Sequence, residues 1–129
     1  DRIAILGTPG GSRIISMVLL GALEFAAGKR PADWVARPRF HHQYLPDAIQ
    51  FEPGAIDALL REDLAALGHA LSEQPQSYGN MQAVQWHKRD DRVEAASDPR
   101  GLGSAEVRRV AVTVQDRSRS GQDAQSVER

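Results

Sequence analysis

A glycine-rich turn between two apolar segments restricts the fold of this chain more than any other feature. A short run of strand type at residues 2–6 leads into Gly7-Thr8-Pro9-Gly10-Gly11, and an apolar stretch at residues 14–27 follows. The pattern predicts a strand, a tight turn and a helix, which Ser12 can cap and after which Gly28 stands. Because apolar residues cover almost the whole circumference of this helix, we expect it to be covered on more than one side.

The composition is typical of one globular domain without a strong charge bias. The chain has 129 residues, of which 41% are hydrophobic and 26% are charged, enough for one hydrophobic core. Polar residues interrupt the longest apolar stretch, which falls short of the roughly 18 residues that a membrane span needs. With 16 basic and 17 acidic residues, the net charge of −1 excludes a field that would attract nucleic acid. No cysteine is present, which excludes disulfides and cysteine-based zinc sites.

Further along the chain, the pattern predicts a mixture of helices and strands. A helical turn is expected at residues 31–34, an extended stretch at 37–43, and an amphipathic helix at 56–67 that ends at Gly68. Segments 82–87 and 92–95 flank a turn and predict a β-hairpin. We expect residues 1–104 to form the structured part and residues 105–129 an atypical polar tail, with one strand at 107–114 and disorder beyond Gln115. The opening strand suggests a piece of a larger fold.

The glycine turn also has the chemistry of an anion site. Gly10 and Gly11 lack Cβ atoms, so a ligand can approach the main chain closely, and their N–H groups can converge beside a positive helix N-terminus. In acyl transfer the anion is the tetrahedral oxyanion. A tight turn without a ligand is the alternative from spacing alone, and phosphate binding is a third, although the Walker spacing with Lys is absent.

Two polar motifs have both a chemical and a structural interpretation. His41 and His42 invite a metal hypothesis, but neighbours in an extended segment point to opposite faces and no further ligand stands at metal-binding spacing. We therefore expect no metal, with one histidine hydrogen-bonded inside and the other near the surface. Arg37 and Arg39 should tie the segment to neighbouring carbonyls or carboxylates. Asp98-Pro99-Arg100 could hold a catalytic Asp, but we favour a turn whose carboxylate accepts local N–H groups.

No complete catalytic set is visible in the sequence. The hydroxyl side chains of Thr8, Ser12, Ser16 and Ser77 lack a base partner at any known motif spacing, and no Gly-x-Ser-x-Gly elbow occurs.

Six motifs in the same order resemble the C-terminal part of the small subunit of γ-glutamyltransferases. They are Leu6-Gly7-Thr8-Pro9-Gly10-Gly11-Ser12-Arg13-Ile14, Pro38-Arg39-Phe40-His41-His42-Gln43-Tyr44-Leu45-Pro46-Asp47, Glu52-Pro53-Gly54, Leu67-Gly68-His69, Gly79-Asn80-Met81-Gln82-Ala83 and Ser97-Asp98-Pro99-Arg100. The match covers about positions 3–104.

The resemblance implies an α+β fold, part of the four-layer αββα sandwich of N-terminal-nucleophile hydrolases, in the order strand, helix, irregular stretch, helix and β-hairpin. It implies an enzyme without a cofactor that cleaves γ-glutamyl amides such as glutathione. A Thr exposed by self-cleavage forms the acyl-enzyme, which passes to water, amino acids or peptides. The backbone N–H groups of Gly10 and Gly11 would stabilise the oxyanion, with Gly11 also close to the substrate. The structural motif residues would be Arg39, His41, His42, Asp98 and Arg100.

The nucleophilic Thr and the residues that bind the substrate's α-amino group precede Asp1 in the family pattern, so we expect this chain alone to be inactive. Its implied partners are the large subunit and the N-terminal part of the small subunit, and the implied location is periplasmic or extracellular. Two alternatives stay open. The chain could belong to a cephalosporin-acylase-like relative, or it could be a non-catalytic fragment or structural domain that self-associates through surfaces which the missing layers would cover.

Overall fold

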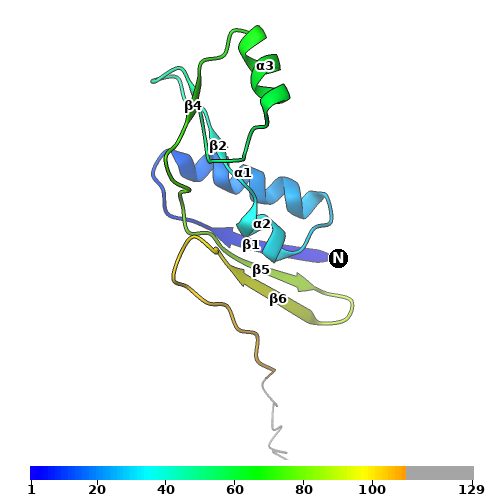
Figure 1. Cartoon of the computed structure of the whole chain (residues 1–129). Helices are drawn as coiled ribbons and strands as arrows, with labels where there is room; N and C mark the ends of the chain where they lie inside the picture. The colour runs from blue at the N-terminus through cyan, green and yellow to red at the C-terminus, as the bar shows by residue number, and fades with distance from the viewer. Residues whose placement is uncertain (110–129) are drawn as a thin grey trace, which may run out of the picture.

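Helices and short strands alternate along the part of the chain that the computed structural model describes, residues 1–109. In chain order the elements are β1 (Arg2–Gly7), α1 (Arg13–Ala26), α2 (Pro31–Ala36), β2 (Phe40–His41), β3 (Ile49–Phe51), α3 (Ala58–Ala66), β4 (Leu71–Glu73), β5 (Gln82–His87) and β6 (Arg92–Ser97). Figure 1 shows β1, β5 and β6 side by side below α1 and α2, with α3 at the opposite end of the molecule. The α+β class is confirmed.

The first sheet joins the N-terminal strand to the predicted hairpin. Its strand order is β1-β5-β6, and β5 is antiparallel to both neighbours. Along β1, the half-buried positions Arg2, Ala4 and Leu6 alternate with the exposed positions Ile3, Ile5 and Gly7. This period of two means that one face of the sheet lies against the helices and the other is open.

The second sheet is small and carries the remaining helix. Its order is β2-β3-β4, with β3 antiparallel to β2 and parallel to β4. A parallel pair needs a crossover connection, and α3 supplies it. The carboxylate of Asp57 caps this helix by accepting a hydrogen bond from the N–H of Leu60 at 2.8 Å. No residue of α3 is buried in this chain.

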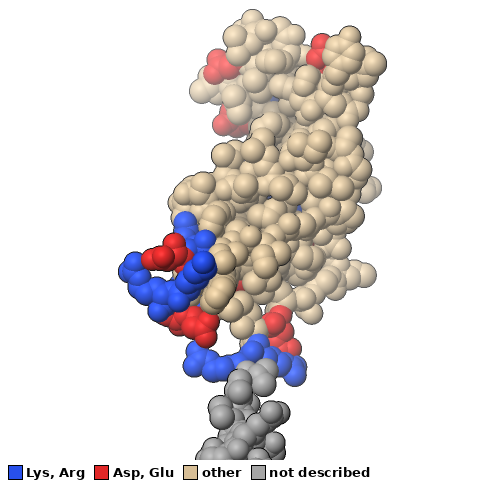
Figure 2. Space-filling view, turned by 180° about the vertical axis from the view of Figure 1, so that it is seen from behind, with Lys and Arg blue, Asp and Glu red and all other residues tan. Residues whose placement is uncertain are grey.

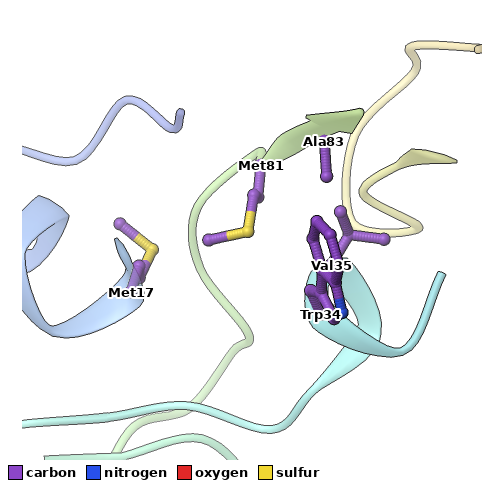
Figure 3. Packing of buried hydrophobic residues seen from close by; sticks show 5 residues of the cluster. All are labelled: Met17, Trp34, Val35, Met81 and Ala83. Atoms are coloured by element: carbon purple, nitrogen blue, oxygen red, sulfur yellow. The ribbon is translucent and has the colours of Figure 1, made fainter. Parts of the chain in front are cut away.

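The hydrophobic core lies between the first sheet and the two helices that cover it. Its buried members are Met17, Trp34, Val35, Met81 and Ala83. Figure 3 shows the two methionine side chains side by side, with Trp34 and Val35 of α2 beneath Ala83. The core therefore reaches from the middle of the sheet to the first turns of α1, beside the glycine turn.

The open face of the first sheet is apolar, and we call it the outer sheet face. The strand register places the following side chains together on it: Ile3 and Ile5 of β1, Val84 and Trp86 of β5, and Val93 and Ala95 of β6. Ile5 is 68% exposed. Seen from behind, the molecule presents a broad surface whose charged side chains are confined to its ends (Figure 2). A second apolar stripe follows α1 through Ile15, Leu19 and Leu23.

Most of the predicted elements are present. The helix predicted from the apolar stretch is α1, the hairpin is β5 and β6, and Gly28 adopts a positive φ of 81° after α1. The prediction that the Ser12 side chain caps α1 was wrong. Ser12 already has helical backbone angles and makes no side-chain cap hydrogen bond, because a capping residue needs an extended backbone. The expectation that α1 is covered on several sides is not met within the described residues, since only Met17, Leu20 and Gly21 are buried.

Part of the predicted tail lies beyond the described residues. Residues 105–109 belong to no helix or strand, and positions 110–129, which include most of the predicted strand and all of the predicted disorder, are not described. Among residues 1–109, no helix has the length and hydropathy that crossing a membrane requires.

Candidate active site

The glycine turn leads directly into α1. The carbonyls of Gly10 and Gly11 accept hydrogen bonds from the N–H groups of Arg13 and Ile14, both at 3.1 Å. Gly10 has a φ of 151° and Gly11 a φ of 57°, in the region that side chains disfavour. Neither glycine N–H has a hydrogen-bond acceptor among residues 1–109. We call residues 7–12 the glycine loop.

The two glycines are required for different reasons. A Cβ atom on Gly10 would lie 2.6 Å from Cε of Met17, so the core closes on this residue. A Cβ on Gly11 would have nothing within 4 Å, so the main chain there is open to the outside. A ligand can therefore approach the main chain closely at Gly11.

The electrostatics of this helix N-terminus favour an anion. The first turn of α1 holds no acidic residue, and its first residue is Arg13. The Arg13 guanidinium donates to the side-chain oxygens of Gln50 at 2.7 Å and Gln74 at 3.1 Å, and it lies 4.4 Å from the ring centre of Tyr78. Within the described part of the chain, no carboxylate neutralises it. The positive helix end and the guanidinium charge therefore add.

Four charged side chains from distant segments form a buried network next to this region. Arg39 and Asp98 are each 1% exposed and are joined by an ion pair between Nη2 and Oδ2. Arg100 donates to Oδ1 of Asp98 at 3.0 Å and to Oε2 of Glu52 at 2.6 Å. Arg39, Asp98 and Arg100, which were expected to be structural motif residues, thus come together with Glu52, which lies in another of the six motifs but had no predicted role.

Hydrogen bonds outweigh the effect of burial on the pKa values of Asp98 and Arg100. Burial alone would raise the pKa of the Asp98 carboxyl, but the N–H groups of Met81 and Arg100 and the guanidiniums of Arg39 and Arg100 together hold that pKa below its usual value. Burial would lower the pKa of the Arg100 guanidinium, and its hydrogen bonds to Glu52 and Asp98 raise it instead. Asp98 is therefore a fixed carboxylate that accepts local N–H groups.

The network holds the segment that faces the glycine loop. Asp98 accepts from the N–H of Met81 at 2.8 Å, Glu52 accepts from the N–H of Tyr78 at 2.8 Å, and Arg39 donates to the carbonyl of Tyr78. Between these residues, the N–H of Asn80 donates to the hydroxyl of Thr8 at 3.3 Å. The network is thus linked to the loop through residues 78–81. Burial, and next the carboxylate of Glu52, raise the pKa of Tyr78 in this segment.

The two adjacent histidines lie in different environments. His41 is 5% exposed, and its Nδ1 is 2.7 Å from Oγ of Ser16 while its Nε2 is 3.0 Å from Oε1 of Gln43. His42 is exposed and lies 2.8 Å from Oδ1 of Asp47. The Ser16 partner was missed in the sequence because 25 residues separate the pair. Nowhere in residues 1–109 do three His, Asp or Glu side chains gather as they would around a metal ion.

Comparisons with known proteins agree on one family. A family model described as gamma-glutamyltranspeptidase matches residues 1–107. A glutathione hydrolase proenzyme of Pseudomonas aeruginosa is 39% identical over 104 residues, which make up 77% of this chain and 18% of the relative. The glutathione hydrolase proenzyme of Escherichia coli is 35% identical over 102 residues, or 76% of this chain and 17% of the relative. The chain thus spans less than a fifth of the length of these curated relatives.

Solved structures show the same likeness. A gamma-glutamyltranspeptidase from Pseudomonas nitroreducens, complexed with L-DON, matches with a TM-score of 0.73 and 34% identity, over 82% of this chain and 55% of that chain. The Bacillus anthracis transpeptidase enzyme CapD matches with a TM-score of 0.71 over 83% of this chain and 64% of its own. Its identity of 21% makes this second likeness one of fold alone.

Proposed function

The chain belongs to the gamma-glutamyltranspeptidase family, and from that premise we propose that it supplies the oxyanion-binding half of an active site that cleaves γ-glutamyl amides. The family is one of enzymes, and the solved neighbours have the N-terminal-nucleophile hydrolase fold of which this chain forms a part. One observation carries the proposal. The N–H groups of Gly10 and Gly11 have no acceptor among residues 1–109 and lie at a positive helix end, with open space beside Gly11.

The proposed reaction uses these N–H groups while negative charge develops. A Thr hydroxyl, supplied from outside these residues, attacks the γ-glutamyl carbonyl carbon and gives its proton to the α-amino group of the same Thr. The carbonyl oxygen becomes an oxyanion that accepts hydrogen bonds from the glycine N–H groups. The C–N bond then breaks, and the departing amine takes the proton. Water, an amino acid or a peptide attacks the resulting ester and regenerates the Thr hydroxyl.

The exposed outer sheet face is a reason to expect that a further part of the enzyme packs on this chain and carries the nucleophile. Ile5 and Trp86 lie on a sheet face that nothing in the described chain covers, and an apolar face of this kind is normally covered by another layer. We propose that the remaining part of the enzyme, comprising the large subunit and the N-terminal part of the small subunit, provides this layer. Glutathione is the proposed substrate, because the relatives at 35% and 39% identity are named glutathione hydrolases.

The test compares two glycines at opposite ends of α1. Gly11 and Gly28 both have positive φ angles, 57° and 81°, and neither has an atom within 4 Å of an added Cβ. Replacement by Ala should therefore cost each variant a similar free energy of unfolding, about 1–2 kcal/mol. In the complete protein that contains this chain, we expect Gly11→Ala to lower kcat for release of p-nitroaniline from γ-glutamyl-p-nitroanilide, and Gly28→Ala to leave kcat unchanged.

Three outcomes would contradict parts of the proposal. Equal kcat values for the two variants would reject the oxyanion role of Gly11. No release by the complete wild-type protein would reject the γ-glutamyl substrate and leave the cephalosporin-acylase-like alternative. Release by the isolated chain, after removal of contaminating enzymes, would reject the external nucleophile. A stable self-associated assembly of the isolated chain without activity would favour the structural alternative.

A further inference from the structure

Two hydrogen bonds join the start of α1 to one strand pair of the second sheet. Arg13 donates to Oε1 of Gln50 at 2.7 Å, and Oγ of Ser16 lies 2.7 Å from Nδ1 of His41. His41 and Gln50 are directly paired across β2 and β3. We call these four residues the α1 anchor.

The spacing on the helix matches the spacing on the sheet. Residues three apart on a helix, such as Arg13 and Ser16, have Cβ atoms about 5–6 Å apart on one face. Directly opposed residues of antiparallel strands, such as His41 and Gln50, have Cβ atoms about 4.5–5.5 Å apart. A helix held at two such points can neither rotate about its axis nor slide along it without breaking one of the bonds.

The hydrogen bonds around His41 also fix which atom is the donor. The side-chain NH₂ of Gln43 donates to the carbonyl of Leu45 at 2.6 Å, so its oxygen faces His41. In the neutral imidazole, Nε2 therefore carries the hydrogen and donates to Gln43, and Nδ1 is left as an acceptor. The hydroxyl of Ser16 then donates to Nδ1, instead of bonding back to its own helix. The bond has a fixed direction, set by the turn after β2.

We propose that the α1 anchor is a positioning device for the glycine loop, a role that rests on the proposed function. The carbonyls of Gly10 and Gly11 accept the first hydrogen bonds of α1, so a rotation or shift of the helix start moves both glycine N–H groups with it. Ser16 follows these two glycines by only six and five residues, about one and a half helical turns. The anchor thereby holds the donors in the direction that the developing oxyanion requires, without touching the substrate.

A direct catalytic role for Ser16 is the competing interpretation, because a hydroxyl, an imidazole and an orienting amide also resemble a nucleophile, its base and its orienting group. Ser16 lies inside α1, where the backbone N–H groups are used by the helix itself. The helix residues beside Ser16 therefore offer no pair of free N–H donors that could stabilise an oxyanion. The positions favour anchoring, and the test below includes the alternative as an outcome.

The test uses the complete protein that contains this chain, as wild type and as Ser16→Ala, Ser16→Thr and Ser77→Ala. Ser77 is exposed and makes no side-chain hydrogen bond within the described part of the chain, so it is the matched control. We expect Ser16→Ala to lower kcat on γ-glutamyl-p-nitroanilide about tenfold with KM within about twofold, since only transition-state stabilisation is lost. Ser16→Thr retains the hydroxyl and should restore most of kcat, and Ser77→Ala should change neither constant.

A second measurement does not depend on activity. Hydrogen exchange at the amides of Arg13 and Ile14, which bond to the two glycines, should become about fivefold faster in Ser16→Ala and stay near the wild-type rate in Ser16→Thr. Gln43→Leu removes the group that orients His41 and should act in the same direction, which keeps the test open if Ser16→Ala fails to fold. Unchanged exchange and unchanged kcat in both Ser16→Ala and Gln43→Leu would overturn the proposal.

Two further outcomes distinguish the positioning role from a nucleophilic role of Ser16 and from the proposed γ-glutamyl function. Covalent labelling of Ser16 by a fluorophosphonate probe would make it a nucleophile and overturn the positioning role. An inactive wild-type protein would reject the γ-glutamyl function alone, because the exchange rates at the start of α1 would still decide whether the anchor holds the loop.

Discussion

Removing the carboxylate of Asp98 should destabilise the protein more than any surface change of equal size. The side chain is fully buried and accepts hydrogen bonds from the N–H groups of Met81 and Arg100 at 2.8 and 3.0 Å. It also binds the guanidiniums of Arg39 and Arg100. In Asp98→Ala, the buried guanidinium of Arg39 keeps only the carbonyls of Val35 and Tyr78.

The magnitude follows from what is left without a partner. Truncating one member of a buried ion pair costs about 3–5 kcal/mol, because the other charge stays buried. The N–H of Met81, which is a core residue, loses its acceptor, and an unsatisfied buried donor costs about 1–3 kcal/mol. The two costs are not fully additive, because both arise from loss of the same buried carboxylate. We expect a loss of about 4–5 kcal/mol, a large share of the roughly 5–15 kcal/mol of a typical domain.

The assay is urea unfolding of the complete protein, followed by tryptophan fluorescence, with Glu73→Ala as the control. Glu73 pairs with Arg61 at 2.6 Å, but both side chains are about 40% exposed. Exposed ion pairs contribute about 0–1 kcal/mol, so the control should lose less than that. A loss in Asp98→Ala within about 1 kcal/mol of the control would refute the view that this network is a buried structural unit.

Three further predictions concern neighbouring features. Because the pKa of Asp98 is lowered in the folded state, its stabilisation is present above the unfolded value and is lost as the pH falls through the folded value. Stability measured by urea unfolding should thus fall below about pH 4, and less steeply in Asp98→Asn than in the wild type. The buried hydroxyl of Tyr78 has no partner among the described residues, so Tyr78→Phe should leave the midpoint of thermal unfolding unchanged or raise it, and a fall of several degrees would indicate a partner elsewhere. Ile5→Ser on the outer sheet face should lower the free energy of unfolding of the complete protein, measured in urea, by about 2 kcal/mol. The control Leu59→Ser on α3 should lower it by less than about 0.5 kcal/mol. Equal losses in the two variants would argue against a covering layer over Ile5.

Local patterns in the sequence were sufficient for the elements that position the site. The apolar stretch predicted α1 and the alternation predicted the hairpin, because each pattern repeats over several turns or residues. The second sheet was not predicted. Its strands are two or three residues long, too short for any alternation to show, and they are held by pairing across the chain instead.

The candidate site likewise has a part that is encoded locally, the glycine loop, and a part that depends on contacts between distant residues. Gly10 and Gly11 could be identified from the sequence because both positions have positive φ angles that favour glycine, and close packing against Met17 adds to this demand at Gly10. The pairing of Arg39 with Asp98 spans 59 residues, and that of Ser16 with His41 spans 25, so no local spacing encodes either. The family resemblance gave structural roles to Arg39, His41 and Asp98. Glu52 lies in one of its motifs without an assigned role and Ser16 lies in none, so only the folded chain reveals their partners.

The apolar pattern of the chain encodes more layers than the described residues contain. Met17 and Leu20 turn one side of α1 into the core, yet Leu19 and Leu23 on the other side are more than half exposed. On β1, Ile5 faces outward and is 68% exposed, with no cover from the described residues. Hydrophobic side chains at regular helix and strand periods indicate burial, and burial on both sides of one helix and one sheet requires neighbours on both sides. Under the proposed function, the layer that covers the outer sheet face belongs to the same part of the enzyme that brings the Thr nucleophile to the glycine loop. A substitution such as Ile5→Ser should then lower activity as well as stability, although its side chain touches neither glycine.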